Sequence, residues 1–134
     1  MAKMRLLVLA AFAVAVTGLG AAENKVTLEG TLVSSGCYLG NPNHPTGNDM
    51  GGKKGCGTDC LRKGEPAGLV TKEGQFHILV VSSLKLAPYV GQEVRITGTD
   101  HDGVIAVEKA EVTKNGKWEE INLKFKEATA TKSN

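Results

Sequence analysis

Three cysteines carry the most specific chemical signal in this sequence. Cys37, Cys56 and Cys60 form a C-x18-C-x3-C pattern, and His44 lies between the first and the second. Thiolate sulfur is a ligand for zinc and for Cu(I), and zinc also accepts an imidazole in a Cys3His set. The residues therefore predict a metal site made by Cys37, Cys56, Cys60 and His44, with zinc or copper as the ion.

The same cysteines are open to two other interpretations. An odd number of thiols in an oxidising compartment also fits a disulfide from Cys37 to Cys56 or to Cys60 with one thiol left over. On a regular helix, Cys56 and Cys60 would have Cβ atoms about 5 to 6 Å apart, whereas a disulfide needs roughly 3.5 to 4.5 Å. Thiol redox exchange is the third interpretation, although no C-x-x-C motif supports it. The three alternatives stay open at this point.

The segment 34–65 must position these residues. Gly, Asn, Pro, Asp and Lys predominate in it and no apolar period is visible, so we expect a long loop inserted after the first strand. Residues 56–64 are compatible with a short helix that ends at Gly64. Three acidic residues near the cysteines are expected to be solvated loop charges: Asp49, Asp59 and Glu65.

The sequence of the rest of the chain predicts mainly short strands. Residues 25–33 alternate apolar and polar side chains, which is the period of a half-buried strand. A Gly-containing connection joins 66–71 to 75–81, as in a β-hairpin. His77 alternates with its apolar neighbours and is expected to be a surface or hydrogen-bonded histidine. Further elements are expected as a helical turn at 82–89, strands at 91–99, 104–107 and 110–112, a turn at Asn115-Gly116 and a last strand through Trp118, Ile121, Leu123 and Phe125.

Five or six strands with little helix indicate an all-β fold, which a small closed barrel satisfies without exposed strand edges. The segment LAPYVGQEVRITGT and its continuation, roughly 84–112, resemble the second half of bacterial exported OB-fold domains. The resemblance implies a five- to six-stranded OB-like barrel with a long Cys-bearing loop after the first strand and a short helix.

A second resemblance covers the cysteines themselves. The pieces 35–40 and Cys56-x3-Cys60-x3-Gly64-x-Pro66 resemble a motif of small exported OB-like bacterial proteins with a Cys-rich insertion, whose function is uncharacterised. That motif runs His-x-x-Cys-Ala-x-x-Cys, whereas here Lys53 stands in place of the His and Gly57 in place of the Ala. A histidine ligand would therefore have to come from His44.

The N-terminal residues predict export. Lys3 and Arg5 precede an uncharged apolar run and a small-residue end, which is the order of a signal peptide at 1–22. We expect an OB-like domain at 23–127 with its insertion at 34–65, and a disordered tail at 128–134. The apolar run is shorter than a bilayer requires, so no membrane span is expected after cleavage and the location is periplasmic or secreted.

Charge and motifs exclude several classes of function. Removal of residues 1–22 leaves 14 Lys and Arg against 14 Asp and Glu, and aromatic residues are few, so nucleic acid is not an expected partner. Neither G-x-S-x-G nor H-E-x-x-H occurs. The expected function is an exported, non-catalytic binding or accessory protein that coordinates a metal through the Cys-rich loop. The alternatives are a disulfide-stapled interaction domain that docks on an envelope protein, and a thiol redox protein.

Overall fold

The structure is a computed structural model that describes residues 24–41, 43, 46–49 and 52–125. The expected signal peptide, His44 and the expected tail lie outside these residues. None of the helices in the described ranges is long and apolar enough to cross a membrane. The elements are β1 (Lys25–Ser34), α1 (Ser35–Gly40), α2 (Cys56–Arg62), β2 (Ala67–Thr71), β3 (Phe76–Val80), α3 (Ser83–Leu86), the 3-10 helix η2 (Ala87–Tyr89), β4 (Glu93–His101), β5 (Val104–Lys114) and β6 (Lys117–Glu120).

The strands close into a ring. Strand β1 pairs antiparallel with β2 on one side and with β4 on the other, and these pair in turn with β3 and β5. Strands β3 and β5 then pair in parallel through 78–80 and 104–106, which completes a five-stranded barrel, while β6 extends the sheet beyond β5. A short helix lies between the third and fourth strands. The expected OB-like barrel is therefore confirmed.

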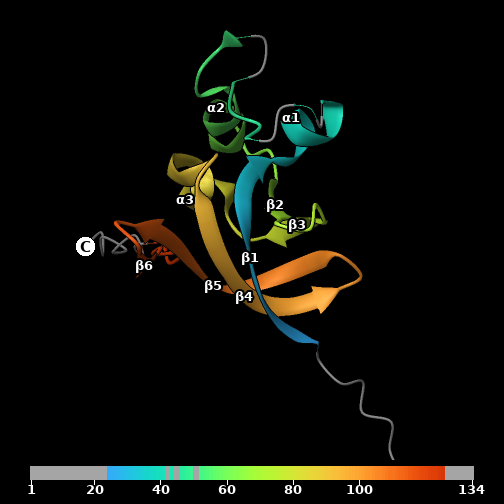
Figure 1. Cartoon of the computed structure of the whole chain (residues 1–134), viewed down its shortest axis with the longest axis vertical. Coiled ribbons are helices and arrows are strands. Elements are labelled where there is room, and N and C mark those ends of the chain that lie inside the picture. The colour runs from blue at the N-terminus through green and yellow to red at the C-terminus, as the bar shows by residue number, and fades with distance from the viewer. Residues whose placement is uncertain (1–23, 42, 44–45, 50–51, 126–134) are drawn as a thin grey trace, which may run out of the picture.

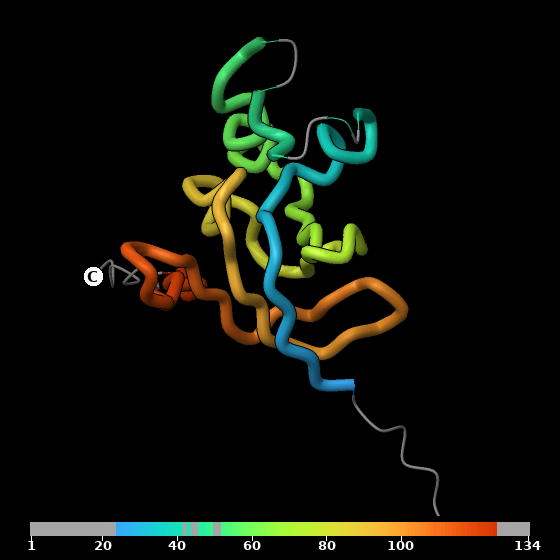
Figure 2. Tube along the Cα trace, viewed as in Figure 1, coloured from blue at the N-terminus to red at the C-terminus, as the bar shows by residue number. Residues whose placement is uncertain are grey.

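Strand β1 leads directly into the cysteine-bearing segment. Its first part pairs with β4 and its last part with β2, and Gly30 and Thr31 pair with both. A Cβ atom on Gly30 would lie 2.2 Å from the carbonyl oxygen of Val70, so only glycine allows the two backbones to approach this closely. Figures 1 and 2 show β1 running up to α1, with α2 at the same end of the barrel.

The barrel interior is filled by the apolar side chains that alternate along the strands. Leu61 of α2 and Leu86 of α3 are fully buried with them, so both helices pack onto the core. This matters for the site because α2 carries two of the cysteines. The largest fully buried apolar side chains are Leu32, Val33, Leu61, Leu69, Leu86, Val94, Ile96, Ile105 and Val112.

Two expected elements differ in the structure. The start of the 34–65 segment is a helix, α1, where a loop was expected. Strand β6 ends at Glu120, whereas strand pairing was expected to continue to Phe125. Ile121 still donates its backbone N–H to the Ala110 carbonyl at 2.8 Å and is buried, and the chain then leaves β5. The expected hairpin at 66–81, the helical turn at 82–89 and the Asn115-Gly116 turn are all present.

His77 is neither a surface nor a hydrogen-bonded histidine. Both of its ring nitrogens are buried and have no hydrogen-bond partner among the described residues. It lies two residues before Leu79, which is 2% exposed, and therefore faces the barrel interior. This register is consistent with the expectation that His77 faces the side opposite Phe76 and Ile78. The expectation that its ring is exposed or hydrogen-bonded was wrong.

Replacing His77 with leucine is expected to stabilise the protein. A buried polar group without a partner costs about 1 to 3 kcal/mol, and a leucine of similar size removes that cost. The free energy of unfolding, measured by urea denaturation, should rise by about 1 kcal/mol. The matched control is His101→Leu at the exposed β4 end, where a change within about 0.5 kcal/mol is expected. A loss of stability in His77→Leu alone would contradict the prediction.

Candidate metal centre

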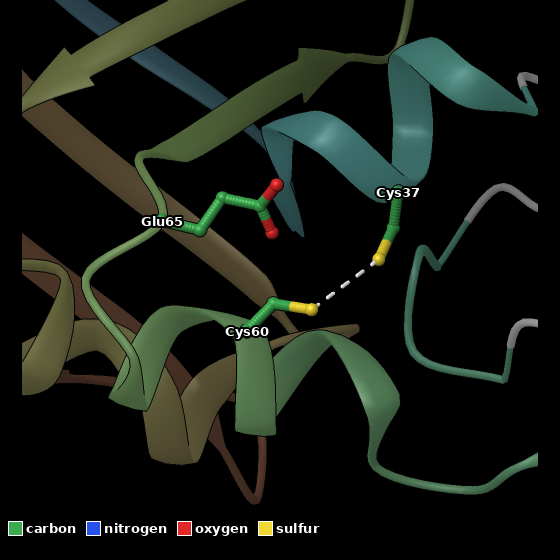
Figure 3. Close-up of side chains that lie close together, drawn as sticks. All are labelled: Cys37, Cys60 and Glu65. Carbon is green, nitrogen blue, oxygen red and sulfur yellow. Dashed lines mark hydrogen bonds between the residues drawn. The ribbon is translucent and has the colours of Figure 1, made fainter.

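Three potential metal ligands converge where α1, α2 and the start of β2 meet. The Cys37 and Cys60 sulfur atoms are 3.9 Å apart, and these atoms and a Glu65 carboxylate oxygen all lie within 4.8 Å of one another. Figure 3 shows the three side chains pointing toward one another from α1, α2 and the segment before β2. All three are half-buried. The sequence therefore folds two thiols and a carboxyl group into one cluster.

The barrel register places Cys37 beside Glu65. Strands β1 and β2 pair up to Ser34 and Ala67, at the point where β1 ends and β2 begins. Immediately beyond, the backbone N–H of Ser35 donates to the Pro66 carbonyl at 3.1 Å, and the Ser35 hydroxyl donates to the same oxygen. These hydrogen bonds hold the first turn of α1 against the residue that follows Glu65.

The Glu65 side chain is held in place by its surroundings. The hydroxyl of Ser34, which is fully buried, donates a hydrogen bond of 2.7 Å to Oε2 of Glu65. A Cβ atom on Gly36 would lie 1.9 Å from the other carboxylate oxygen, Oε1. The carboxylate thus occupies space that a side chain at position 36 would fill. The expectation that Glu65 is a solvated loop charge was wrong.

The C-terminus of α2 turns the chain back over Cys60. Gly64 adopts a positive φ of 96°, and its N–H donates to the Leu61 carbonyl, while the Glu65 N–H donates to the Cys60 carbonyl at 3.1 Å. These two bonds form a Schellman motif, in which the glycine reverses the chain. The expected helix ending at Gly64 is confirmed, and the reversal is what brings Glu65 next to Cys60.

The N-terminus of α2 is capped from the preceding loop. Gly55 supplies no capping side chain, and Asn48 takes that role by accepting a hydrogen bond from the Thr58 N–H at 3.0 Å. The Asn48 side-chain amide donates to the Val90 carbonyl at 3.2 Å. Because one side chain binds both the helix and the barrel end, α2 and its Cys60 are fixed relative to the core.

The cluster favours the protonated form of the Cys60 thiol as long as no cation is present. Burial, followed by the hydrogen bonds and negative charges of Glu65 and Cys37, raises the pKa of the Cys60 thiol from 9.0 to about 11. The nearby basic side chains Lys53 and Arg62 contact Asp59 instead, at 3.4 and 3.8 Å. A bound divalent cation would supply the positive charge that lets Cys60 ionise.

The distances suit a metal better than a preformed disulfide. Two thiolates on a tetrahedral zinc ion, each about 2.3 Å from the metal, are roughly 3.8 Å apart, whereas bonded sulfurs are about 2.05 Å apart. The observed 3.9 Å is close to the first value, and without an ion it is the length of a hydrogen bond between the two thiols. Zinc also accepts a carboxylate oxygen at about 2.0 to 2.2 Å, so the donor set fits this ion.

The structure brings together part of the set predicted from the sequence. Cys37 and Cys60 meet, and Glu65, which the sequence did not indicate as a ligand, joins them. Cys56 lies one turn before Cys60 at the start of α2, and among the described residues it is not part of this group. His44 lies outside the described residues, so its role stays a prediction.

Comparisons with protein-family profiles, with curated proteins and with solved structures found no match. The described residues form an OB-like barrel with a cluster of two cysteines and one glutamate in the segment between its first two strands. The likeness to exported bacterial OB-like proteins with a Cys-rich insertion stays a prediction.

Proposed function

We propose that this protein is an exported, non-catalytic metal-binding domain, in which Cys37, Cys60 and Glu65 hold one zinc ion. The observation that carries the proposal is the 3.9 Å separation of the two sulfur atoms beside a carboxylate. Three donors leave a fourth position on a tetrahedral ion, and His44 is the candidate that the sequence offers for it. Export to the periplasm or the medium rests on the signal-peptide pattern of residues 1–22.

Zinc is favoured over copper by the chemistry of the donors. Cu(I) prefers soft sulfur ligands, and the described cluster contains two sulfurs and one hard carboxylate oxygen. Zinc accepts sulfur, nitrogen and oxygen together. Cys56 stays outside the ligand set that we propose.

A Cys37–Cys60 disulfide is the second candidate, because the same proximity would allow it to form in an oxidising compartment. Such a disulfide would stabilise the segment between β1 and β2 in a domain that binds an envelope protein. The third alternative, a thiol redox enzyme, receives less support, since a Cys60 pKa near 11 leaves little of the nucleophilic thiolate at neutral pH.

Intact mass spectrometry of protein purified from its native compartment distinguishes the candidates. For the zinc site we expect one zinc ion per chain under native conditions, its loss on denaturation, and three alkylatable thiols afterwards. A mass lower by two hydrogens, one alkylatable thiol and no metal would instead favour the stapled domain. Reduced, metal-free protein that takes up no zinc when the ion is added back would overturn the proposal.

A further inference from the structure

We propose that zinc binding and oxidation of the Cys37–Cys60 pair exclude each other, so that a disulfide compound or protein in the same compartment releases the metal. The inference rests on the proposed function and adds the regulation of that site. The two states exclude each other because the same two sulfur atoms, which lie 3.9 Å apart, would either bind the ion or form the disulfide.

A small movement connects the two states. The sulfurs must approach one another from 3.9 Å to about 2.05 Å to form a bond. A change of rotamer at a cysteine moves its sulfur by a distance of this order without a change in the backbone. The two residues also come from different helices, α1 and α2, and are 23 residues apart in the chain. A disulfide between them would therefore link α1 to α2.

Oxidation would remove most of the ligand set. Of the three clustered donors, two are the cysteine sulfurs and only the Glu65 carboxylate would be left. A single carboxylate is a poor substitute for the three protein ligands of a stable zinc site. The metal would then leave as the hydrated ion.

The exchange balances with a disulfide as the oxidant. One cysteine thiolate attacks a sulfur of the external disulfide, forms a mixed disulfide and expels one external thiolate. The second cysteine thiolate then attacks the mixed disulfide, which forms the Cys37–Cys60 bond and expels the other external thiolate. The pair of cysteines loses two electrons and the external disulfide gains them. External thiols reverse both steps, and the restored thiolates can bind zinc again.

The zinc-binding equilibrium and the thiol–disulfide equilibrium of the cysteine pair are therefore coupled. Zinc binds the reduced pair and not the disulfide, so it favours reduction and makes the midpoint potential less negative. For a two-electron couple, a tenfold change in the equilibrium constant corresponds to about 30 mV. Each tenfold increase in free zinc above its dissociation constant should therefore raise the midpoint potential by about 30 mV.

The test is a redox titration of the purified protein in mixtures of reduced and oxidised glutathione, with free zinc set by a metal buffer. The fraction of Cys37–Cys60 disulfide is read by alkylation and peptide mass spectrometry. The expected result is the shift of about 30 mV for each tenfold increase in free zinc. The Cys56→Ser variant should show the same shift, because Cys56 is outside the proposed ligand set.

The outcomes separate this inference from the function on which it rests. Zinc binding by the reduced protein with a midpoint that does not move, or with no Cys37–Cys60 disulfide at any potential, would overturn the coupling alone. Absence of zinc binding by the reduced protein would overturn the function and the coupling together. Loss of the shift in Cys56→Ser would also overturn it, since the exchanging pair would then involve Cys56.

Discussion

Replacing Cys60 with serine should lower the zinc affinity of the reduced protein by more than about 100-fold. Loss of an outer hydrogen-bond partner of a ligand already costs about 10- to 100-fold, and Cys60 is proposed to bind the ion directly. Its sulfur lies 3.9 Å from that of Cys37 and within 4.8 Å of a Glu65 carboxylate oxygen. Competition with a chromophoric chelator at fixed pH measures the effect.

A graded series of variants makes this prediction specific. Ser34→Ala removes only the hydroxyl that holds the Glu65 carboxylate and should cost about 10- to 100-fold in affinity. Cys56→Ser should leave the affinity nearly unchanged, because Cys56 is not in the described group. Circular dichroism confirms that each variant is folded. Equal losses in Cys56→Ser and Cys60→Ser would show that Cys56 is also a ligand, as in the three-cysteine set predicted from the sequence.

The second large effect is a steep dependence of zinc affinity on pH. The Cys60 pKa is about 11 in the metal-free protein, so zinc must displace this proton throughout the neutral range. Apparent affinity should therefore rise at least about tenfold per pH unit between about pH 6 and 8, with release of a proton that a weakly buffered solution reports. An affinity that is flat over this range would mean that Cys60 is not a ligand.

The same pKa has a consequence for the metal-free, reduced protein at alkaline pH. The folded-state pKa of Cys60 is raised above its ordinary value of 9.0, so the unfolded chain loses the proton first as the pH increases. The associated stability is fully present below about pH 9 and is lost as the pH rises through about 11. Bound zinc should suppress this loss, because the thiolate is then already formed, and urea denaturation with and without zinc provides the comparison.

Local patterns were sufficient to predict most of the barrel. The alternation in 25–33 and the turn residues at Lys72-Glu73-Gly74 and Asn115-Gly116 specify strands and hairpins through neighbours in the chain. Helix α1 was not predicted, because six residues that include Gly36 and Gly40 have no helical apolar period to recognise. Its position depends on the Ser35–Pro66 contacts, which join distant parts of the chain.

The sequence indicated candidate ligand residues, but it could not indicate which of them lie together. The cysteine spacing indicated a metal or a disulfide, yet it could not choose between Cys56 and Cys60 as the neighbour of Cys37. That choice is made by the orientation of α2, which depends on Asn48, Val90 and the burial of Leu61. Glu65 was missed because its approach to Cys60 needs the chain reversal at Gly64. The pair Gly64-Glu65 after a predicted helix was the one available signal.

The double contact of Asn48 has a consequence for recognising this site elsewhere. Because that side chain caps α2 and also binds the barrel, the cysteine segment transplanted alone into another scaffold would lose the geometry that unites Cys37 and Cys60. The segment therefore needs its contacts with the barrel to form the site. A search of other sequences for the same site should therefore require an asparagine between the two cysteines and Gly-Glu after the second, together with strands of an OB-like barrel on both sides.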